Sequence, residues 1–347
     1  MGLHVALLGT GGWSRVHLAA FAASKDVDHV TIAGRNADAA QTLAEQFPDL
    51  STAHSDIESA CDAPTVDVVS ICLPHHLHTD MSCRALAAGK HVICEKPAGT
   101  SLADFDRIAQ TATDHEKRFL VVMNQLYNPL VLRARQLIDD GAIGRPFLCV
   151  ETGFSKHAHF YRDANAWRTR IEQAGGGVLI DGGYHMIYKQ LYLLAGVAKP
   201  RWVIADTSQL NVNHSGKLSP EIGEDCVSYT VGFDCPLRIV SSHAWTLEAN
   251  IEHPRHGFIA GSEGTLELPV GADDPLVLRR DEKTETIADP GGPHTGPDTT
   301  HCCLLDYLEA ITAGRTIENA TVESARETLS VITSIYESSV QQKRVDI

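Results

Sequence analysis

An amine, a carboxylate and an imidazole are the side chains of this sequence best placed to do chemistry, and the amine is that of Lys96. Lys96 follows the apolar run 91–94, which is typical of a buried parallel strand, and stands between Glu95 and Pro97. Because a proline ring disfavours helical backbone in the residue before it, Lys96 is held in an extended or turn conformation. A lone Glu-Lys-Pro could equally be a surface turn, so the prediction that Lys96 is catalytic depends on its neighbours.

The carboxylate and the imidazole belong to Asp181 and His185, which follow the glycine run 175–177. Four residues apart, they are expected to share one face of a helix, about one turn from each other. A carboxylate near an imidazole can orient it and raise its basicity, which suits a general base near neutral pH. The pair could simply decorate a helix surface, but after three glycines and together with Lys96 both are predicted to be catalytic.

A glycine-rich turn near the start predicts a dinucleotide site. The apolar run 4–8 indicates a strand, and a helical stretch through Phe21 follows the turn. In this setting Gly-x-Gly-x-x-Ser matches the motif whose first glycine permits the tight turn and whose second lets backbone approach a pyrophosphate. Ser14 replaces the third glycine, which predicts slightly wider packing there. The cofactor contacts expected from this turn are Gly9, Gly11, Gly12, Trp13 and Ser14.

Strands and helices alternate over residues 1–123. Strands are predicted at 30–33, 66–73, 91–94 and 119–123, and helices at 37–47, 76–88 and 102–116. This alternation is typical of parallel pairing and predicts a Rossmann domain, a doubly wound α/β sheet that binds ligands at the carboxyl ends of its strands. The further cofactor contacts expected at those ends are Gly34, Arg35, Leu73, Pro74, His75, His78, Glu95 and Lys96.

The end of the second strand bears on the choice of cofactor. Enzymes that use NAD usually place an acid there to bond the ribose hydroxyls, but this sequence has Gly34-Arg35-Asn36. No carboxylate is present to repel a 2′-phosphate, and Arg35 is able to pair with one, so NADP is favoured over NAD. An inward-turned Asp38 would weaken that preference.

Three imidazoles in four residues, those of His75, His76 and His78, raise the question of a metal site. They open a predicted helix at the nucleotide-binding edge and lack a nearby set of cysteine or carboxylate partners. We therefore predict no metal, and assign these histidines to cofactor contact or to packing at the helix start.

From residue 124 onward the sequence loses its alternation. A helix is predicted to about Asp140, then a turn, and then longer strand-like runs at 147–152, 201–210, 225–233, 237–245 and 264–268. This pattern predicts an α+β domain over 124–347 built on a large open, mostly antiparallel sheet. Residues 271–300 are rich in Gly, Pro and Asp and are predicted to form loops or a mobile excursion.

Composition restricts the partners and the compartment. With 347 residues and 43% hydrophobic content the chain has core enough for two domains, and its net charge of -15 argues against a nucleic-acid or anionic-membrane partner. Nine cysteines without a Cys-x-x-Cys pair favour a reducing compartment, so a cytoplasmic protein is predicted. The sequence starts with neither a basic leader nor a long apolar segment, so we expect no targeting or membrane-spanning segment.

Together these motifs resemble those of one family. The glycine turn, Glu95-Lys96-Pro97, Trp167-Arg168 and the run from Gly175 to His185 are similar to the glucose-fructose oxidoreductase/inositol dehydrogenase/rhizopine catabolism (Gfo/Idh/MocA) family, and the similarity extends to residues 306–314 and 344–347. The resemblance implies a substrate pocket between two domains, and an open sheet that buries its free face in a homodimer or homotetramer. It also implies a cis Lys96–Pro97 bond, and it places Trp167 and Arg168 at the nicotinamide.

Some positions depart from the family pattern. Ser14 and Gly34 replace a glycine and an acid, and both bear on the cofactor. The remaining departures bear on the substrate: His75 stands where asparagine is common, Leu126 where arginine is common, and Tyr188 where an acid is common.

The resemblance implies reversible oxidation of a secondary alcohol on a sugar, cyclitol or related polyol. His185 would take the hydroxyl proton as hydride passes to the nicotinamide, Lys96 would stabilise the oxygen, and Asp181 would hold another hydroxyl or fix the histidine. Polyol recognition uses side chains that donate and accept hydrogen bonds. From the candidates His157, His159, Tyr161, His243 and His301 we select His157 and His301 as additional substrate contacts.

Two alternatives stay open. A nucleotide that never leaves could oxidise a sugar transiently, so that a glycosidic bond breaks by elimination with the help of the same residues. The other alternative is a catalytically silent nucleotide-binding regulator, against which the retained Lys96, Asp181 and His185 argue.

Overall fold

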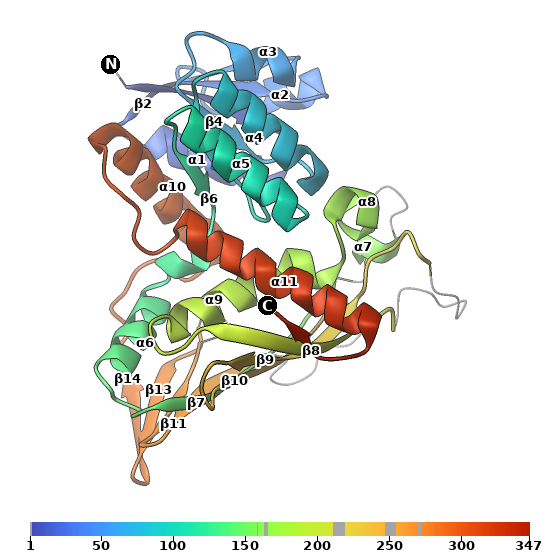
Figure 1. The fold of residues 1–347 in the computed structure, drawn as a ribbon. Coiled ribbons are helices and arrows are strands. Elements are labelled where there is room, and N and C mark those ends of the chain that lie inside the picture. The colour runs from blue at the N-terminus through green and yellow to red at the C-terminus, as the bar shows by residue number, and fades with distance from the viewer. Residues whose placement is uncertain (1, 158, 163–165, 211–218, 247–254, 270–272) are drawn as a thin grey trace. The chain divides into compact units, whose positions relative to one another are not determined.

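The computed structural model describes residues 2–157, 159–162, 166–210, 219–246, 255–269 and 273–347. The chain forms two compact units (Figure 1). Residues 1–124 and 296–326 make up the first unit, and residues 125–295 and 327–347 make up the second. The domains expected from the sequence were 1–123 and 124–347. The expected boundary is one residue from the end of the first segment of unit one, at residue 124. Residues 296–326, however, were expected in the second domain and belong to the first unit.

The first unit is built on six parallel strands in the order β3-β2-β1-β4-β5-β6. All four residues of β4 and the last four of β1 are buried, because helices cover both faces of the sheet. This confirms the predicted Rossmann fold. The strands are β1 (Leu3–Leu8), β2 (Val27–Ala33), β3 (Ser51–His54), β4 (Val68–Ile71), β5 (His91–Cys94) and β6 (Phe119–Val121).

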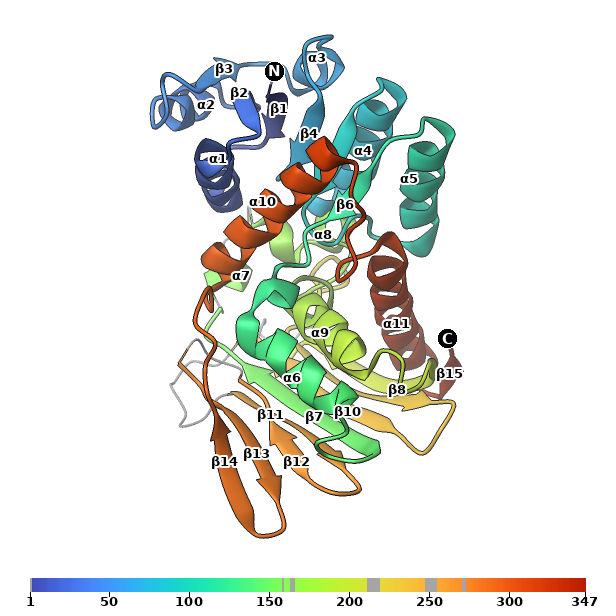
Figure 2. The same ribbon diagram turned by 90° about the vertical axis from the view of Figure 1, so that its left-hand side faces the viewer.

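The strand order reverses at β1, which determines where the helices lie. Helices α1 (Gly12–Ala23) and α2 (Ala37–Ala44) connect strands on one side of β1, whereas α4 (His78–Ala87) and α5 (Leu102–Asp114) connect strands on the other. Right-handed connections therefore place the two pairs on opposite faces of the sheet (Figure 2). The short helix α3 (Ile57–Asp62), which was not predicted, is capped by the Asp56 carboxylate.

Helix α10 (Gly296–Ala313) belongs to the first unit and packs against α1. The buried Tyr307 hydroxyl donates to the Val121 carbonyl at 2.6 Å. The Asn124 side-chain amide donates to the Gly296 carbonyl at 3.1 Å and to the Thr300 hydroxyl at 3.0 Å. The prediction of loops through residue 300 is therefore wrong at this end.

The second unit is built on a nine-stranded sheet in the order β14-β13-β12-β11-β7-β10-β9-β8-β15. Every pairing is antiparallel except that of β7 with β10. The predicted large, mostly antiparallel sheet is therefore confirmed. Its strands are β7 (Pro146–Phe154), β8 (Pro200–Ser208), β9 (Cys226–Phe233), β10 (Arg238–Ala244), β11 (Arg255–Gly261), β12 (Thr265–Glu267), β13 (Leu276–Arg280), β14 (Lys283–Ile287) and β15 (Val345–Asp346).

One face of this sheet carries helices. Helices α6 (Pro129–Asp139) and α9 (Tyr184–Leu194), with residues 327–341 of α11 (Val322–Gln341), lie over it (Figure 2). Side chains alternate along a strand, so Ile239 and Ser241 are buried while Val240, between them, is 41% exposed on the opposite face. Ile204 on β8 is likewise 49% exposed.

Two strands occupy a segment that was expected to be loop. Strands β13 and β14 pair as a hairpin within residues 271–300, so the loop prediction is wrong for 276–287. Residues 271 and 272 of that segment lie outside the described part of the chain.

Two further findings concern the whole described chain. Among the residues that the structure describes, no helix is both long and apolar enough to cross a membrane. All nine cysteines lie in described segments, and each is a free thiol.

Candidate functional site

The glycine turn at the end of β1 has the properties of an anion site. Gly9 has a φ of 115°, and a Cβ there would lie 2.4 Å from the Cys72 carbonyl oxygen, so only glycine fits between the ends of β1 and β4. A Cβ at Gly11 or Gly12 would meet nothing within 4 Å. Gly11 is the N-cap of α1 and provides no side-chain cap to its first N–H groups. Open space beside N–H groups at the positive end of a helix suits a pyrophosphate.

The end of β2 carries Gly34 and Arg35, and no acid among the residues described there points inward. Gly34 is buried, and a Cβ there would lie 2.7 Å from Thr10 Cγ2. Arg35 is exposed, and so is Asp38, which therefore does not turn inward. Asn36 caps α2 by accepting the Ala39 N–H at 3.0 Å.

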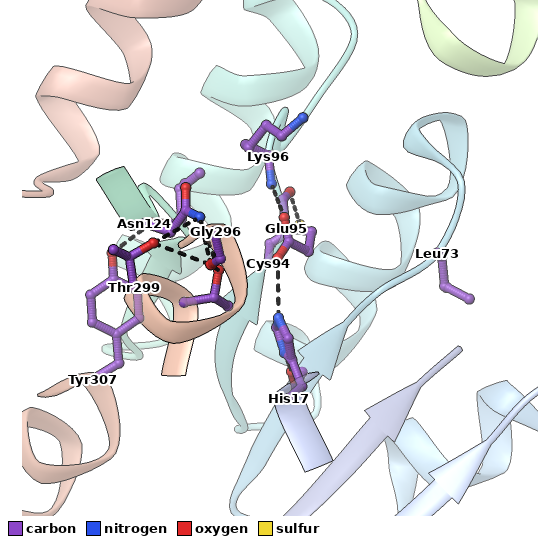
Figure 3. Close-up of polar contacts among 12 residues, drawn as sticks. His17, Leu73, Cys94, Glu95, Lys96, Asn124, Gly296, Thr299 and Tyr307 are labelled. Atoms are coloured by element: carbon purple, nitrogen blue, oxygen red, sulfur yellow. Dashed lines mark hydrogen bonds and ion pairs between the residues drawn. The ribbon is translucent and has the colours of Figure 1, made fainter. Parts of the chain in front are cut away.

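The backbone at Lys96 is held by a chain of polar side chains that starts at the buried Ser70 and His17 and ends at Glu95 (Figure 3). The Lys96 side chain is largely buried, and its backbone N–H donates to Glu95 Oε2 at 3.2 Å. The other Glu95 oxygen is 3.1 Å from His17 Nε2, and His17 Nδ1 is 2.8 Å from the Ser70 hydroxyl. A carboxylate only accepts, so Nε2–H donates to Glu95, while Nδ1 shares a hydrogen bond with the Ser70 hydroxyl. The Lys96–Pro97 bond is cis, as the family resemblance implied.

His78 ties the ends of β4 and β5 together. Its Nδ1 is 2.7 Å from the Pro97 carbonyl oxygen and its Nε2 is 2.7 Å from the Leu73 carbonyl oxygen. Burial lowers the pKa of His78, while the two carbonyls act in the opposite direction. Both ring nitrogens thus already contact backbone, which favours helix-start packing over the cofactor contact predicted for His78. His75, in the turn His75–Leu77, is also buried, with its ring 5.6 Å from that of His78.

In the second unit a glycine run meets a buried carboxylate. A Cβ at Gly177 would lie 1.9 Å from the Glu224 carbonyl oxygen, so this position admits no side chain. The Glu224 carboxylate accepts the N–H groups of Gly177 at 2.9 Å and Leu179 at 2.8 Å, and the Tyr336 hydroxyl at 3.0 Å. Burial raises the pKa of Glu224 to about 7. Glu224 therefore caps the helical segment that begins after Gly177, although Glu224 itself comes much later in the sequence.

That segment carries Asp181 and His185. Asp181 lies in a π-helical turn, Leu179–Gly183, and His185 lies in the first turn of α9. A π turn hydrogen-bonds i to i+5, so the two residues are not spaced by one regular α-helical turn as predicted. Asp181 Oδ2 is 3.3 Å from Arg168 Nε, and His185 Nδ1 is 3.0 Å from the Tyr188 hydroxyl.

Aromatic side chains surround Arg168. Its guanidinium lies 4.5 Å from the ring centre of Trp167 and 5.7 Å from that of Phe160. The Phe160 ring stacks on His157 with centroids 5.5 Å apart and packs edge to face against Trp245 at 5.6 Å. This arrangement holds Arg168 beside Asp181.

The further candidates fall into different units. His157 Nδ1 forms a hydrogen bond of 2.8 Å with the Ser155 hydroxyl. The Tyr161 hydroxyl donates to the Glu224 carbonyl at 2.7 Å. His243 lies against Gly182, where an added Cβ would be 2.9 Å from the ring. These residues, with His159, belong to the second unit, whereas His301 lies on α10 of the first unit.

Comparison with known proteins identifies the family. Residues 3–123 match an oxidoreductase family with an NAD-binding Rossmann fold, and residues 131–267 match the GFO/IDH/MocA C-terminal domain. The chain belongs to the Gfo/Idh/MocA family.

Curated relatives in this family include sugar and inositol enzymes. Levoglucosan dehydrogenase of Pseudarthrobacter phenanthrenivorans is 31% identical over 55% of this chain and 51% of its own. Inositol 2-dehydrogenase of Rhizobium meliloti is 28% identical over 56% of each chain. The matched region thus spans about half the length of these relatives. A solved levoglucosan dehydrogenase in complex with NADH and levoglucosan covers 100% of both chains with a TM-score of 0.87 at 24% identity, which shows the fold.

Two supporting residues of this Gfo/Idh/MocA protein were not singled out from sequence. His17 is a fully buried polar residue in α1, and its place among apolar neighbours was the available signal. Glu224 lies 47 residues from Gly177, and no local pattern links the two.

Proposed function

We propose that this protein transfers hydride between a secondary alcohol of a sugar, cyclitol or related polyol and a nicotinamide cofactor. The observation that carries the proposal is the presence of buried supports under each predicted catalytic group: His17 and Glu95 under Lys96, and Glu224 under the segment bearing Asp181 and His185. These supports hold the backbone from which the catalytic side chains project, and groups positioned in advance are suited to stabilising charge in a transition state. The names of the matched dehydrogenases support the substrate class.

Each side chain has a distinct proposed role. His185 accepts the hydroxyl proton, and Lys96 donates a hydrogen bond to the same oxygen and stabilises its developing charge. Asp181, paired with Arg168, binds a second hydroxyl, and His157 and His301 are proposed as further substrate contacts. The bound nicotinamide supplies the hydride acceptor.

We propose NADP as the cofactor, with NAD as the alternative. The first turn of α1 after Gly11 would hold the pyrophosphate, and Trp167 and Arg168 would contact the nicotinamide. The exposed Arg35, without an acid at the end of β2, supports recognition of a 2′-phosphate. The solved relative named above contains NADH, so both nucleotides belong in the test.

The test is reduction of NADP or NAD by a panel of levoglucosan, myo-inositol and methyl glucosides, followed by absorbance at the nicotinamide wavelength. Lys96→Ala and His185→Ala are each expected to lower kcat by about 100-fold or more. Because Lys96 and His185 belong to different compact units, the double variant is informative. If both residues act on one step, the fold-decrease in kcat of the double variant is smaller than the product of the fold-decreases of the two single variants.

Other outcomes would redirect the assignment. Cleavage of a glucoside with nucleotide that stays bound and is not consumed would identify the redox-assisted glycosidase. Unchanged cellular function after Lys96→Ala would identify a nucleotide-binding regulator.

We further propose that the chain assembles as a homodimer or homotetramer through its larger sheet. The exposed Val240 and Ile204 lie on the face opposite the helices and support this. Sedimentation analysis of the wild type and of a Val240→Lys variant tests it, with a monomeric variant expected. Nine free thiols support a reducing compartment, and we propose the cytoplasm.

A further inference from the structure

Tyr188 occupies a position from which it can control His185. It lies three residues after His185 on α9 and is buried. Its hydroxyl oxygen is 3.0 Å from His185 Nδ1 and accepts the backbone N–H of Gln125 at 2.9 Å. The rings of Tyr188 and His185 meet edge to face with centroids 5.6 Å apart, and Tyr184 packs on Tyr188 in the same way at 5.9 Å. The phenol oxygen is thus held in place from several directions.

The direction of the bond between Tyr188 and His185 decides what the imidazole can do. A neutral imidazole carries a proton on one nitrogen and a lone pair on the other. If the phenol donates to Nδ1, the proton resides on Nε2, and neither nitrogen is free to take a substrate proton. If Nδ1–H donates to the phenol oxygen, the lone pair of Nε2 is available.

The Gln125 contact is compatible with the second arrangement. A backbone N–H can only donate, so it uses one lone pair of the phenol oxygen. That oxygen has a second lone pair, so it has the capacity to accept the Gln125 N–H and the His185 Nδ1–H together.

We propose that Tyr188 is a positioning residue that holds His185 as the Nδ1–H tautomer and leaves Nε2 as the base. The inference rests on the proposed function, because a base at His185 is what requires this tautomer. Tyr188 acts through His185 and needs no contact with the substrate or the cofactor.

The tautomer can be measured without a substrate. Full-length protein labelled with ¹⁵N-histidine is studied by two-bond ¹H–¹⁵N correlation at pH 8.5, about two units above the ordinary histidine pKa. The His185 signals are assigned by their loss in His185→Gln. A protonated Nδ1 with an unprotonated Nε2 is expected. The opposite pattern, with the proton on Nε2, overturns the proposal.

Tyr188→Phe removes only the hydroxyl, and Tyr192→Phe, one turn further along α9, is the matched control. With the panel alcohol that the wild type oxidises, Tyr188→Phe is expected to lower kcat by about 10- to 100-fold with KM changed by less than about threefold. The His185 spectrum should change to a mixture of tautomers. The control variant Tyr192→Phe should change neither kcat nor the His185 spectrum. A Tyr188→Phe variant with wild-type kcat and an unchanged His185 spectrum overturns the proposal.

Two remaining outcomes are also decisive. If Tyr188→Phe does not fold, the wild-type spectrum alone accepts or rejects the Nδ1–H tautomer. If no panel alcohol reduces either nucleotide, the proposed function fails, while the spectrum still decides whether Tyr188 holds His185.

Discussion

The two compact units place their functional side chains by different means. In the first unit Gly9, Leu73 and Lys96 follow neighbouring parallel strands, so the topology of the sheet gathers them at one edge. In the second unit Asp181 and His185 lie close together in the chain, but Glu224 and Tyr336, which support their segment, come from much later in the sequence. The first site is organised by a repeating local pattern, and the second by contacts across the unit.

The glycines show the same difference. Gly11 and Gly12 border open space, whereas the space beside Gly177 is filled by the backbone of Glu224. Glycine in the first unit thus leaves room for a ligand, and glycine in the second leaves room for the protein itself. Substitutions at these positions should therefore separate binding from folding.

The largest effect is expected for Gly177→Ala. A Cβ 1.9 Å from a carbonyl oxygen and 2.6 Å from the Glu224 nitrogen requires backbone movement, so a loss of about 4 kcal/mol or more in unfolding free energy is expected. Urea unfolding followed by tryptophan fluorescence measures it, with Gly12→Ala as control. Equal urea midpoints for Gly177→Ala and the wild type would remove the distinction between the two glycine runs.

Glu224→Gln should change how stability depends on pH. The pKa of Glu224 is raised from 4.5 to about 7, so between these values the native state binds a proton that the unfolded state has lost. Its contribution to stability therefore decreases as pH rises from 4.5 to 7, by on the order of 3 kcal/mol. Glutamine does not titrate, so the unfolding free energy of the wild type relative to the variant should fall by this amount over that range.

The measurement is a set of urea midpoints from pH 4.5 to 8. Glu221→Gln is the matched control because that side chain is exposed, with its carboxylate 3.8 Å from Arg170. A constant difference between the wild type and Glu224→Gln across the range would show that Glu224 has no raised pKa.

Gly12→Ala is expected to weaken nucleotide binding while preserving the fold. The added methyl group meets no protein atom but points into the space where a pyrophosphate would approach the start of α1. Titration followed by nucleotide fluorescence should show an increase in Kd of about tenfold, or about 1.4 kcal/mol. An unchanged Kd would place the pyrophosphate elsewhere.

The smallest effect is expected for Arg35→Ala. Loss of one exposed guanidinium should raise the Kd for NADP by about fivefold, because an exposed charge pair is screened by solvent. The Kd for NAD serves as the internal control and should stay the same. Equal effects on both nucleotides would mean that Arg35 does not contact the 2′-phosphate.

Much of the first unit was predictable because its signals are local. Apolar runs predicted five of the six parallel strands, and the glycine turn predicted the start of α1. Strand β3, Ser-Thr-Ala-His, has no apolar run and was not predicted. Helix α10 was not predicted because it begins inside the Gly-, Pro- and Asp-rich stretch 271–300, although proline is also common at the first position of a helix. Its packing on α1 depends on contacts between residues about 290 positions apart, which sequence patterns do not reveal.

The hairpin of β13 and β14 was missed for a different reason. Its turn residues Asp281 and Glu282 both have positive φ, which in hairpins is usually signalled by glycine or asparagine. The buried supports His17 and Glu224 were likewise missed, because their importance comes from partners that only the tertiary structure brings to them.

The capping of the segment after Gly177 has a consequence for hydrogen exchange. Amide hydrogens in the first turn of a helix usually exchange rapidly with solvent, since they have no partner within the helix. Here the amides of Gly177, Val178 and Leu179 all donate to Glu224, through its carboxylate or its backbone carbonyl. Deuterium should therefore enter this helix start as slowly as it enters the centre of the large sheet, making the Asp181 segment one of the last parts of the second unit to open.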